Sequence, residues 1–582
     1  MNLVLVAIHL EPSPRAVPLG PAMLASVVKR AFPGAVHTRI LDLFLQQSAE
    51  TCAAQILALE PDWVGFSLYL WNRSLGREIA KVLRQQKPSL LLFAGGAEAS
   101  ADPSGVLGEG FLDFVLPGEG EELIVEVVGK LLQGASAEEI RRTVRPGSVK
   151  DLGTLPSPYL DGTLDPHAYA GMLWELSRGC PFRCDFCFES RGTEGTRRVP
   201  MERVTAELRH FEACEVSQVF VLDPTFNFDK RQAKAILRLI AAEAPAIHFF
   251  FEIRSEFMDA ELAQLFAAIR CSLQIGLQSA DDAVLRLINR SIDREDFEAK
   301  VLLLHQAGAP YGFDLIYGLP GDTLEGFQAS LDFALCLAPN HLDIFPLSVL
   351  PGTRLQETAP SFGLQHLADI PYTVIASPGF SEADMRVAAR LARACDLLYN
   401  QGKAIPWFAI LLEALAVAPS ELFERFADYL DSHDDPDITA LQVAFFTARL
   451  AQPKASAIAA DIVSYFGYSG ALLEATALQP EGTAGTPEAW LRTHARLVAF
   501  HHDPLALLEQ LEAGITDLDS LGSVLADQPC QALLHRQDEA TLMQVLSPRE
   551  AEALDRVQRG TATASQRQDA VQFLETLLGS GH

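Results

Sequence analysis

The chain has 582 residues, more than one hydrophobic core supports, so three or four domains are expected. Its formal net charge of −29 at pH 7 argues against a nucleic-acid partner, because a phosphate backbone calls for basic patches. No apolar run approaches the roughly 20 residues that span a bilayer, and the first residues lack the basic start of a secretory signal. Nine cysteines without regular pairing, in a chain this long, suit a reducing compartment. The composition thus predicts a cytoplasmic protein without a membrane or nucleic-acid partner.

Residues 1–134 alternate short apolar runs with amphipathic helical patterns. Buried strands that alternate with such helices form a parallel sheet covered on both faces. The sequence therefore predicts a doubly wound, Rossmann-like α/β domain. Its expected strands lie at 2–8, 36–41, 63–69, 90–94 and 111–116, and its expected helices include 21–31, 49–59 and 75–85.

Three of these strands are followed by loops that suit a ligand site. The loops are SLYLWN (67–72), AGGAEAS (94–100) and PGEGEE (117–122), and the segment PLG (18–20) precedes the first helix. Ligands of doubly wound sheets bind at the carboxyl ends of the strands, near the point where the strand order reverses. Glycines there let the backbone approach a ligand, although a single glycine after a strand is more often only a turn.

Residues 135–170 are rich in Pro and Gly and are typical of a linker between domains. A second alternation of strands and helices fills 171–362. The expected strands lie at 172–176, 218–222, 247–253, 272–276, 311–317 and 341–349, and the expected helices at 201–215, 230–242, 259–268, 294–307 and 323–337. Six strand–helix units fall short of the eight of a full barrel, and in barrels the chemistry sits at the carboxyl ends of the strands.

The loop after the first of these strands carries three cysteines in eight residues, CPFRCDFC (180–187). Thiolates gathered this closely usually hold metal. A structural zinc site needs four ligands, and no fourth stands at a suitable spacing, whereas iron–sulfur clusters are held by cysteine thiolates, ordinarily four. Cys180, Cys184 and Cys187 therefore suggest a four-iron (4Fe-4S) cluster with one iron open to a non-protein ligand. Zinc with an unseen fourth ligand stays the alternative.

The C-x3-C-x2-C spacing resembles that of the radical S-adenosylmethionine enzymes. The resemblance implies a partial (β/α)6 TIM-like barrel, open along one side. It also implies a cluster that binds S-adenosylmethionine at its open iron, with release of a 5′-deoxyadenosyl radical. The segments LDPTFN (222–227), IGLQS (275–279) and IYGLPGDT (316–323) resemble further family motifs, with Pro224 and Gln278 each in place of an acid. Carried over residue by residue, the implied S-adenosylmethionine contacts are Phe186, Asp223, Thr225, Glu252, Arg254, Gln278, Ser279, Tyr317 and Leu319.

The N-terminal loops, taken together and in this order, resemble the cobalamin-binding domain that precedes the radical domain in one large subgroup of that family. The D-x-H-x-x-G motif, whose histidine ligates cobalt in many other cobalamin proteins, is absent, as is common in this subgroup. Tyr69, Trp71 and Asn72 are candidates for lining the lower face of cobalt, and aromatic packing in a seam between domains is the alternative. The implied cobalamin contacts are Leu19, Gly20, Ser67, Tyr69, Trp71, Asn72, Gly95, Gly96, Glu98, Gly118, Glu119, Gly120 and Glu121.

Residues 363–582 are rich in Ala and Leu and show helical periodicity, so a mainly α-helical C-terminal domain of unknown role is expected. The helical pattern includes 488–501, and several more helices are predicted over 504–578. No segment of this part carries a recognisable catalytic or binding motif.

The resemblance favours a cobalamin-dependent methyltransferase, in which methylcobalamin supplies a methyl group to an unactivated carbon of a small molecule or peptide. Ring formation or rearrangement with the same cofactors is an alternative, as is a cobalamin sensor without activity, although a sensor need not keep all three thiolates. An RNA methylthiotransferase would need three more N-terminal cysteines, and residues 1–134 hold only Cys52. The implied cluster requires an external electron donor of the flavodoxin or ferredoxin type. No side chain is assigned to catalysis, and no oligomeric state is predicted.

Overall fold

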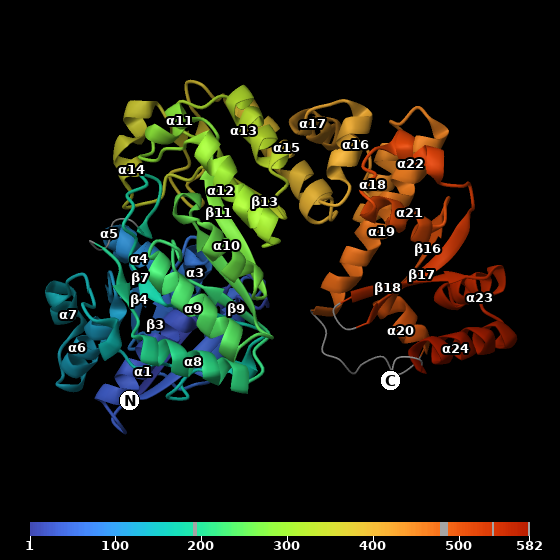
Figure 1. The fold of residues 1–582 in the computed structure, drawn as a ribbon. Helices are drawn as coiled ribbons and strands as arrows, with labels where there is room; N and C mark the ends of the chain where they lie inside the picture. Colours follow the sequence, from blue (N-terminus) through green and yellow to red (C-terminus); the bar gives the residue numbers. More distant parts are fainter. Residues whose placement is uncertain (190–194, 478–486, 538–539, 580–582) are drawn as a thin grey trace. The chain divides into compact units, whose positions relative to one another are not determined.

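The computed structural model describes residues 1–189, 195–477, 487–537 and 540–579 (Figure 1). These residues form two compact units. The first unit joins Met1–Phe327 to Ile344–Met385, and the second joins Gln328–Asp343 to Arg386–His582. The first unit holds the N-terminal sheet, the cysteine loop and all of the second sheet except the start of its last strand, His341–Asp343.

A five-stranded parallel sheet begins the first unit, and it confirms the doubly wound α/β prediction. Its order is β2-β1-β3-β4-β5, and most side chains of β1, β3 and β4 are buried, as their apolar sequences require. Helix α1 packs against α6 and α2 packs against α3. The elements are β1 (Asn2–His9), α1 (Leu19–Ala31), β2 (His37–Phe44), α2 (Ala49–Leu57), β3 (Trp63–Ser67), α3 (Arg73–Gln86), β4 (Leu91–Gly95), α4 (Ala97–Ala101), α5 (Pro103–Gly108), β5 (Phe114–Val115), α6 (Gly120–Leu132) and α7 (Ala137–Thr143).

The strand order reverses between β1 and β3. From β1 the chain moves outward to β2 and then returns to the other side of β1 to form β3. In doubly wound sheets the ligand crevice lies outside the carboxyl ends of the two strands at such a reversal. The loop after β1 and the loop Ser67–Asn72 after β3 therefore flank the expected ligand position.

The second sheet has six strands, and their spatial order follows the order of the chain from β6 to β13. The strands from β6 to β12 are parallel, while β6 and β13 stand at the two edges, so the sheet is the predicted partial barrel. Helices α8, α9, α10 and α12 pack side by side in that order along it (Figure 1). The elements are β6 (Met172–Trp174), α8 (Met201–Ala213), β9 (Gln218–Val221), α9 (Lys230–Glu243), β10 (His248–Ile253), α10 (Ala260–Ala267), β11 (Cys271–Gln278), α11 (Asp282–Arg286), α12 (Arg294–Ala307), β12 (Tyr311–Tyr317), α13 (Leu324–Cys336), β13 (His341–Pro346), α14 (Arg354–Thr358), β14 (Gln365–His366) and β15 (Val374–Ala376).

The segment between the two sheets lies against the first of them. Lys29 and Arg30 of α1 donate hydrogen bonds to the carbonyl oxygens of Asp161 and Thr154, each at 2.8 Å. The hydroxyl of Tyr169 donates to Asp42 on β2 at 2.8 Å. These contacts hold residues 150–170, which lead to the first barrel strand, against the N-terminal α/β domain.

Helices dominate the second unit, as predicted. They include the end of α15 (Glu382–Cys395), α16 (Phe408–Leu415), α17 (Pro419–Leu430), α18 (Ile438–Thr447), α19 (Pro453–Ala477), α20 (Pro487–His494), α21 (Pro504–Glu512), α22 (Leu518–Val524), α23 (Pro548–Gln558) and α24 (Ala564–Gly579). Among the described helices, none combines the length and hydropathy of a bilayer-spanning segment.

The purely helical expectation for 488–501 and 504–578 is wrong in three places. β16 (Ala495–Phe500), β17 (Cys530–Gln537) and β18 (Ala540–Leu546) form an antiparallel sheet in the order β16-β17-β18. Side chains of β18 alternate between exposed and half-buried, which is the period-two pattern of a strand. That alternation is short and stands between strong helical patterns, which is why the periodicity over the whole stretch suggested helices.

Candidate active site in the first unit

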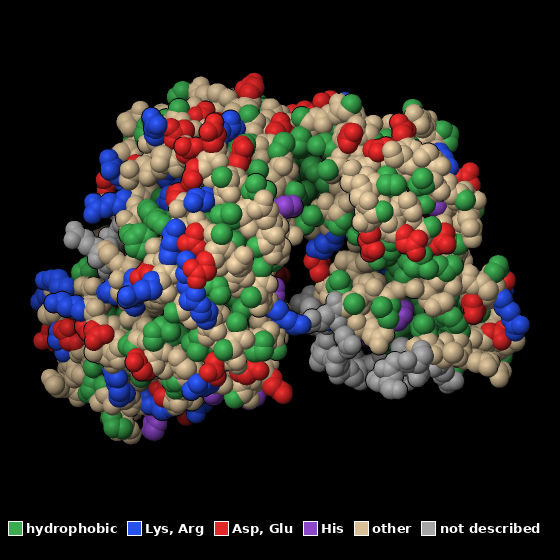
Figure 2. Space-filling view, viewed as in Figure 1, with side chains coloured by type: hydrophobic (Ala, Val, Ile, Leu, Met, Phe, Trp, Pro, Cys, Tyr) green, Lys and Arg blue, Asp and Glu red, His purple; other side chains and the backbone are tan. Residues whose placement is uncertain are grey.

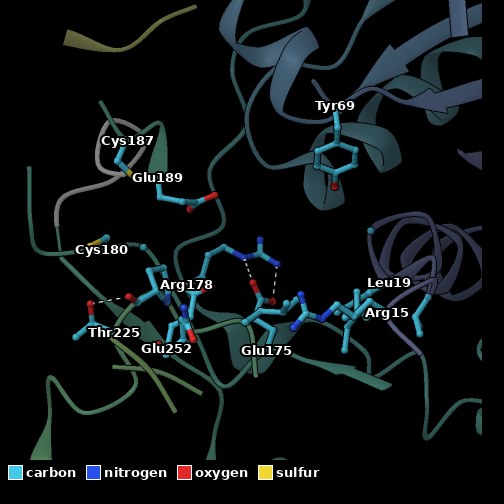
Figure 3. A pocket seen from close by; sticks show the side chains of 18 of the residues that line it. Arg15, Leu19, Tyr69, Glu175, Arg178, Cys180, Cys187, Glu189, Thr225 and Glu252 are labelled. Atoms are coloured by element: carbon cyan, nitrogen blue, oxygen red, sulfur yellow. Dashed lines mark hydrogen bonds and ion pairs between the residues drawn. The ribbon is translucent and has the colours of Figure 1, made fainter. Parts of the chain in front are cut away.

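A cavity of about 740 Å³ lies within the first unit, between the N-terminal sheet and the partial barrel. One side is lined by the loops that follow β1 and β3, and the other by the ends of the barrel strands and by the cysteine loop. Figure 3 shows Cys180 and Cys187 on one side of the cavity and Tyr69 and Leu19 on the opposite side. The cavity therefore joins the two regions that the sequence singled out separately.

The cysteine loop is held at its base by two short strands. β7 (Ser177–Arg178) precedes it, β8 (Arg197–Arg198) follows it, and the two pair antiparallel. Cys180, Cys184 and Cys187 all line the cavity. Burial, with a smaller contribution from the nearby Cys184 and Cys180, raises the pKa of the Cys187 thiol to about 11. Such thiols ionise when a cation binds them, so the loop is suited to hold metal.

The spacing of the thiols bears on which metal group fits. Among the described residues, no three His, Cys, Asp or Glu side chains converge as ligands of a single ion. A zinc ion needs four ligands around one point, whereas each thiolate of an iron–sulfur cluster binds its own iron. Cys180, Cys184 and Cys187 supply three of the thiolates that such clusters use, and one ligand fewer than a structural zinc site needs.

Asp223 supports the strand that leads into the cysteine loop. Its carboxylate accepts hydrogen bonds from the backbone N–H groups of Leu176 and Ser177, both at 2.9 Å, and from Ser177 Oγ at 2.6 Å. Burial raises the pKa of Asp223 to about 6, although these hydrogen bonds act in the opposite direction. Asp223 does not line the cavity. It is therefore placed to position the loop.

Gln278, at the end of β11, is the polar residue of the barrel with the most unusual geometry. Its φ is +61°, and the register between β11 and β12 shifts at this point. The side chain is buried and lines the cavity, and its Oε1 atom has no hydrogen-bond partner in the described structure. Strained backbone and an unsatisfied buried oxygen both mark a position shaped for a ligand. A hydroxyl or amine donor of a bound molecule would satisfy Oε1.

The remaining implied S-adenosylmethionine contacts divide into two groups. Those that line the cavity are Phe186, Thr225, Glu252 and Arg254. Burial raises the pKa of Glu252, while the positive charge of Arg15 opposes this. Those that do not line it are Ser279, Tyr317 and Leu319, which are buried at the ends of the strands.

At the opposite side of the cavity, the loop after β3 presents two stacked aromatic rings. The rings of Tyr69 and Trp71 lie 4.6 Å apart and within 2° of parallel. Trp71 is 45% exposed although its indole N–H donates to the Ile8 carbonyl. Asn72 is buried and fully engaged: it accepts from the Tyr69 N–H and donates to the carbonyls of Ile8 and Ser67. Asn72 therefore fixes the loop, and the two rings offer the flat surface.

Leu19, Gly20, Ser67 and Glu121 also line the cavity, but the glycines after β4 do not. Gly96 instead lies directly against the Tyr69 loop, where a side chain at this position would meet the Leu68 carbonyl oxygen at 2.5 Å. Glu98 accepts from Arg73 at 3.0 Å and from the Tyr372 hydroxyl at 3.1 Å. Gly95, Gly96 and Glu98 thus stand behind the loop and support it.

The PGEGEE loop joins the N-terminal sheet to the cysteine loop through ion pairs. Arg178, two residues before Cys180, donates to Glu175 and to Glu121, both at 2.7 Å (Figure 3 shows the Glu175 pair). Glu119 accepts from Arg197 at 2.8 Å and lies 3.5 Å from Arg178. Gly118 and Gly120 do not line the cavity; a β-carbon at Gly118 would meet the Gly147 carbonyl oxygen at 2.5 Å, and one at Gly120 would meet the end of the Leu24 side chain at 2.9 Å. Through these ion pairs, Glu119 and Glu121 therefore hold the loop after β5 against the cysteine loop, and Glu121 also lines the cavity.

Three arginines that line the cavity were missed by the sequence reasoning: Arg15, Arg178 and Arg290. Arg15 reaches from the loop after β1 and lies 4.8 Å from the Phe220 ring. Arg290 donates to the Gly276 carbonyl at 2.7 Å, interacts with Cys184, and leaves its Nε without a partner among the described residues. Of the three, only Arg178 carried a usable signal, because it immediately precedes the Gly-Cys that opens the motif.

Two family models match this chain. The model of the radical SAM superfamily matches residues 174–334, and the model of the B12 binding domain matches residues 11–128. The first match includes all three cysteines, and the second includes the loops after β3, β4 and β5.

Two curated relatives match a little over half of this chain. The chain is 28% identical over 343 residues to the cobalamin-dependent radical SAM methyltransferase TokK of Streptomyces tokunonensis, covering 53% of this chain and 50% of TokK. It is 26% identical to 2-(S-pantetheinyl)-carbapenam-3-carboxylate methyltransferase of Streptantibioticus cattleyicolor, covering 56% of this chain and 52% of that protein. The chain thus spans about half the length of these relatives.

Solved structures share the fold at lower identity. The radical SAM methyltransferase TsrM of Kitasatospora setae, with cobalamin and a [4Fe-4S] cluster bound, matches with a TM-score of 0.52 at 19% identity, covering 63% of this chain and 76% of TsrM. The cobalamin-dependent S-adenosylmethionine radical enzyme OxsB matches with a TM-score of 0.54 at 15% identity, covering 90% of this chain and 82% of OxsB. The likeness to OxsB extends into the C-terminal part.

Both domain matches, the cysteine spacing and the shared cavity agree with one another. The chain therefore carries a B12-binding domain at residues 11–128, followed by a radical SAM domain at residues 174–334.

Proposed function

We propose that this protein is a cobalamin-dependent radical S-adenosylmethionine methyltransferase acting on an unactivated carbon of a small molecule or peptide. The observation that carries the proposal is the single cavity with cysteine thiols on one side and the stacked Tyr69 and Trp71 rings on the other. A substrate carbon in this cavity can face a cluster-bound S-adenosylmethionine and a corrin ring at the same time. Relatives named as methyltransferases support the reaction type.

The roles proposed for the chain's residues follow from their positions. Cys180, Cys184 and Cys187 hold the cluster, and Gln278 accepts a hydrogen bond from S-adenosylmethionine through its unsatisfied oxygen. Tyr69 and Trp71 lie beneath the corrin. TsrM has been solved with the analogue aza-SAM and its substrate tryptophan, which supports a small-molecule substrate.

When bound, the cluster and S-adenosylmethionine supply the 5′-deoxyadenosyl radical, and cobalamin carries the methyl group. The chain's own contribution is orientation and exclusion of water. The stacked rings and the buried loop that holds them keep one face of the cavity apolar, and the ion pairs of Arg178 fix that face relative to the cysteine loop.

The proposal requires a one-electron donor, and we assign this role to a carrier of the flavodoxin or ferredoxin type. It also requires an environment in which thiols stay reduced. All nine cysteines of the chain lie outside disulfide bonds, which fits a cytoplasmic location.

Anaerobic reconstitution tests the proposal. The protein should bind about four irons and should cleave S-adenosylmethionine to 5′-deoxyadenosine under reduction. Cys184→Ala should lose both properties, whereas the matched control Cys214→Ala, at the end of α8 and outside the cavity, should keep them. Persistent 5′-deoxyadenosine formation by Cys184→Ala would refute the assignment.

Labelling separates methyl transfer from its alternative. With methyl-labelled S-adenosylmethionine, a methyltransferase must move the label into cobalamin and then into product. Ring formation or rearrangement with the same cofactors leaves product unlabelled. Failure to retain any corrinoid after reconstitution would contradict both reactions.

A further inference from the structure

We propose that His9, the last residue of β1, is the axial ligand of cobalt on the side of the corrin ring that faces the N-terminal sheet. This inference rests on the proposed function, because it needs cobalamin in the cavity. His9 lies outside both family-model matches, since the B12-binding match begins at residue 11, so the comparisons give it no role.

His9 stands where a corrin is expected. The strand order reverses between β1 and β3, and ligands of such sheets bind outside the carboxyl ends of the two strands at the reversal. His9 ends β1 and lines the cavity, and it is the only histidine among the described residues that line it. The Trp71 indole N–H donates to the carbonyl of Ile8, the preceding residue, at 3.2 Å. The strand end that carries His9 therefore adjoins the stacked rings of Tyr69 and Trp71.

The hydrogen bond of His9 determines which ring nitrogen can bind a metal. Its Nε2 lies 2.7 Å from Oδ1 of Asp42 on β2. A carboxylate only accepts hydrogen bonds, so Nε2 carries the proton, and in the neutral ring the lone pair stands on Nδ1. Nδ1 has no hydrogen-bond partner in the described structure and is not shut off from solvent. A neutral imidazole with one open nitrogen is the commonest side-chain ligand of metal ions.

Asp42 is itself held in place from its other side. Its Oδ2 accepts from the hydroxyl of Tyr169 at 2.8 Å. On β2 the ring of Phe44 lies 5.7 Å from the imidazole of His9. Metal-ligating histidines almost always donate their other ring N–H to a carboxylate, carbonyl or water, which fixes the ring and raises its basicity. Asp42 therefore gives His9 the support that a metal ligand needs.

The side chains that the loop after β3 contributes to the cavity suit cobalt less well. Asn72 is engaged in three hydrogen bonds, and the indole nitrogen of Trp71 is a donor only. The hydroxyl of Tyr69 interacts with Ser67, and burial raises the pKa of Tyr69, so the hydroxyl stays protonated. The two rings then support the corrin beside His9, and the imidazole provides the nitrogen donor. An axial nitrogen is one of the groups by which a protein tunes the electronics of a metal cofactor.

Electron paramagnetic resonance of bound cob(II)alamin tests the assignment. The unpaired electron couples to an axial nitrogen, so a ¹⁴N ligand splits the cobalt lines into triplets and a ¹⁵N ligand splits them into doublets. With ¹⁵N-labelled histidine in the reconstituted full chain, and with its cluster left oxidised, we expect doublets. The label enters all 14 histidines, several of which show at the surface in Figure 2, but only a nitrogen bound to cobalt splits its lines.

His9→Gln should lose the doublets. The matched control, His37→Gln, should keep them, because His37 is an exposed histidine at the start of β2 in the same sheet and does not line the cavity. Doublets that persist in His9→Gln, or that are lost equally in His37→Gln, would overturn the assignment of His9.

The spectrum of the labelled wild type decides even if His9→Gln fails to fold. Triplets would show that the benzimidazole of cobalamin binds the metal, and lines without nitrogen splitting would show that a ring such as Trp71 lies beneath it. Either result overturns this inference and leaves the proposed function standing. A wild-type protein that retains no corrinoid would overturn the proposed function together with the inference.

Discussion

Gly96 should control cobalamin binding without touching the ligand. Its backbone has φ +92° and ψ −179°, a region that only glycine occupies readily, so any side chain there costs about 1–3 kcal/mol. A β-carbon would also meet the Leu68 carbonyl oxygen at 2.5 Å and the Leu68 nitrogen at 2.9 Å. Overpacking of this kind adds about 1–3 kcal/mol. Gly96→Ala therefore costs about 2–6 kcal/mol unless the loop of Tyr69 and Trp71 moves away.

Movement of that loop displaces the stacked rings, so we expect cobalamin affinity to fall at least about tenfold, which corresponds to 1.4 kcal/mol. Equilibrium titration of reconstituted protein with cobalamin, followed by absorption, measures this. Gly110→Ala is the matched control, because Gly110 also has a positive φ of +81° but nothing within 4 Å of a β-carbon. Its cost should be only about 1–2 kcal/mol of stability, with cobalamin affinity unchanged. If both variants bind cobalamin equally well, the support given to the loop by Gly96 does not matter for binding.

Three further variants test other parts of the site. In Gly276→Ala a β-carbon would meet the Gln278 amide at 2.7 Å, so calorimetry should show S-adenosylmethionine binding weakened about tenfold, and unchanged binding would argue against Gln278 as a contact. The pKa of Asp223 is raised from 3.8 to about 6, so its contribution to the free energy of unfolding is complete below pH 3.8 and is lost as pH rises through 6. Asp223→Asn should remove that loss. Denaturation profiles of wild type and variant with equal dependence on pH would contradict this. Arg178→Gln leaves Glu121 buried without its partner and should lower the free energy of unfolding by about 3–5 kcal/mol, and a loss below about 1 kcal/mol would show that the ion pairs are dispensable.

Much of the architecture could be predicted because its signals are local. The parallel strands are short apolar runs, and their alternation with amphipathic helices predicts both sheets. The cysteine motif is equally local, since its three sulfurs lie within eight residues. The strands of the second unit were missed because a period-two pattern of seven residues in β18 is weak beside long helical patterns.

The roles of individual polar residues were harder to predict, because they depend on contacts between distant segments. Glu98 was expected to meet cobalamin, yet it pairs with Arg73 and with Tyr372, which lies 274 residues further along the chain. Arg15 belongs to the loop after β1 of the N-terminal sheet, yet it lies 4.8 Å from the ring of Phe220 on the barrel strand β9. No periodicity or spacing in a single sequence reports such pairs.

The coexistence of both cofactors in one cavity is tested most directly by pulsed electron paramagnetic resonance. The reconstituted protein would be prepared with cob(II)alamin and with its cluster reduced by one electron, and the magnetic interaction between the two centres would be measured. Strong coupling, lost in Cys184→Ala together with the cluster signal, is the expected result. Cluster and cob(II)alamin signals without any magnetic interaction would show that the thiols and the stacked rings do not belong to one active site.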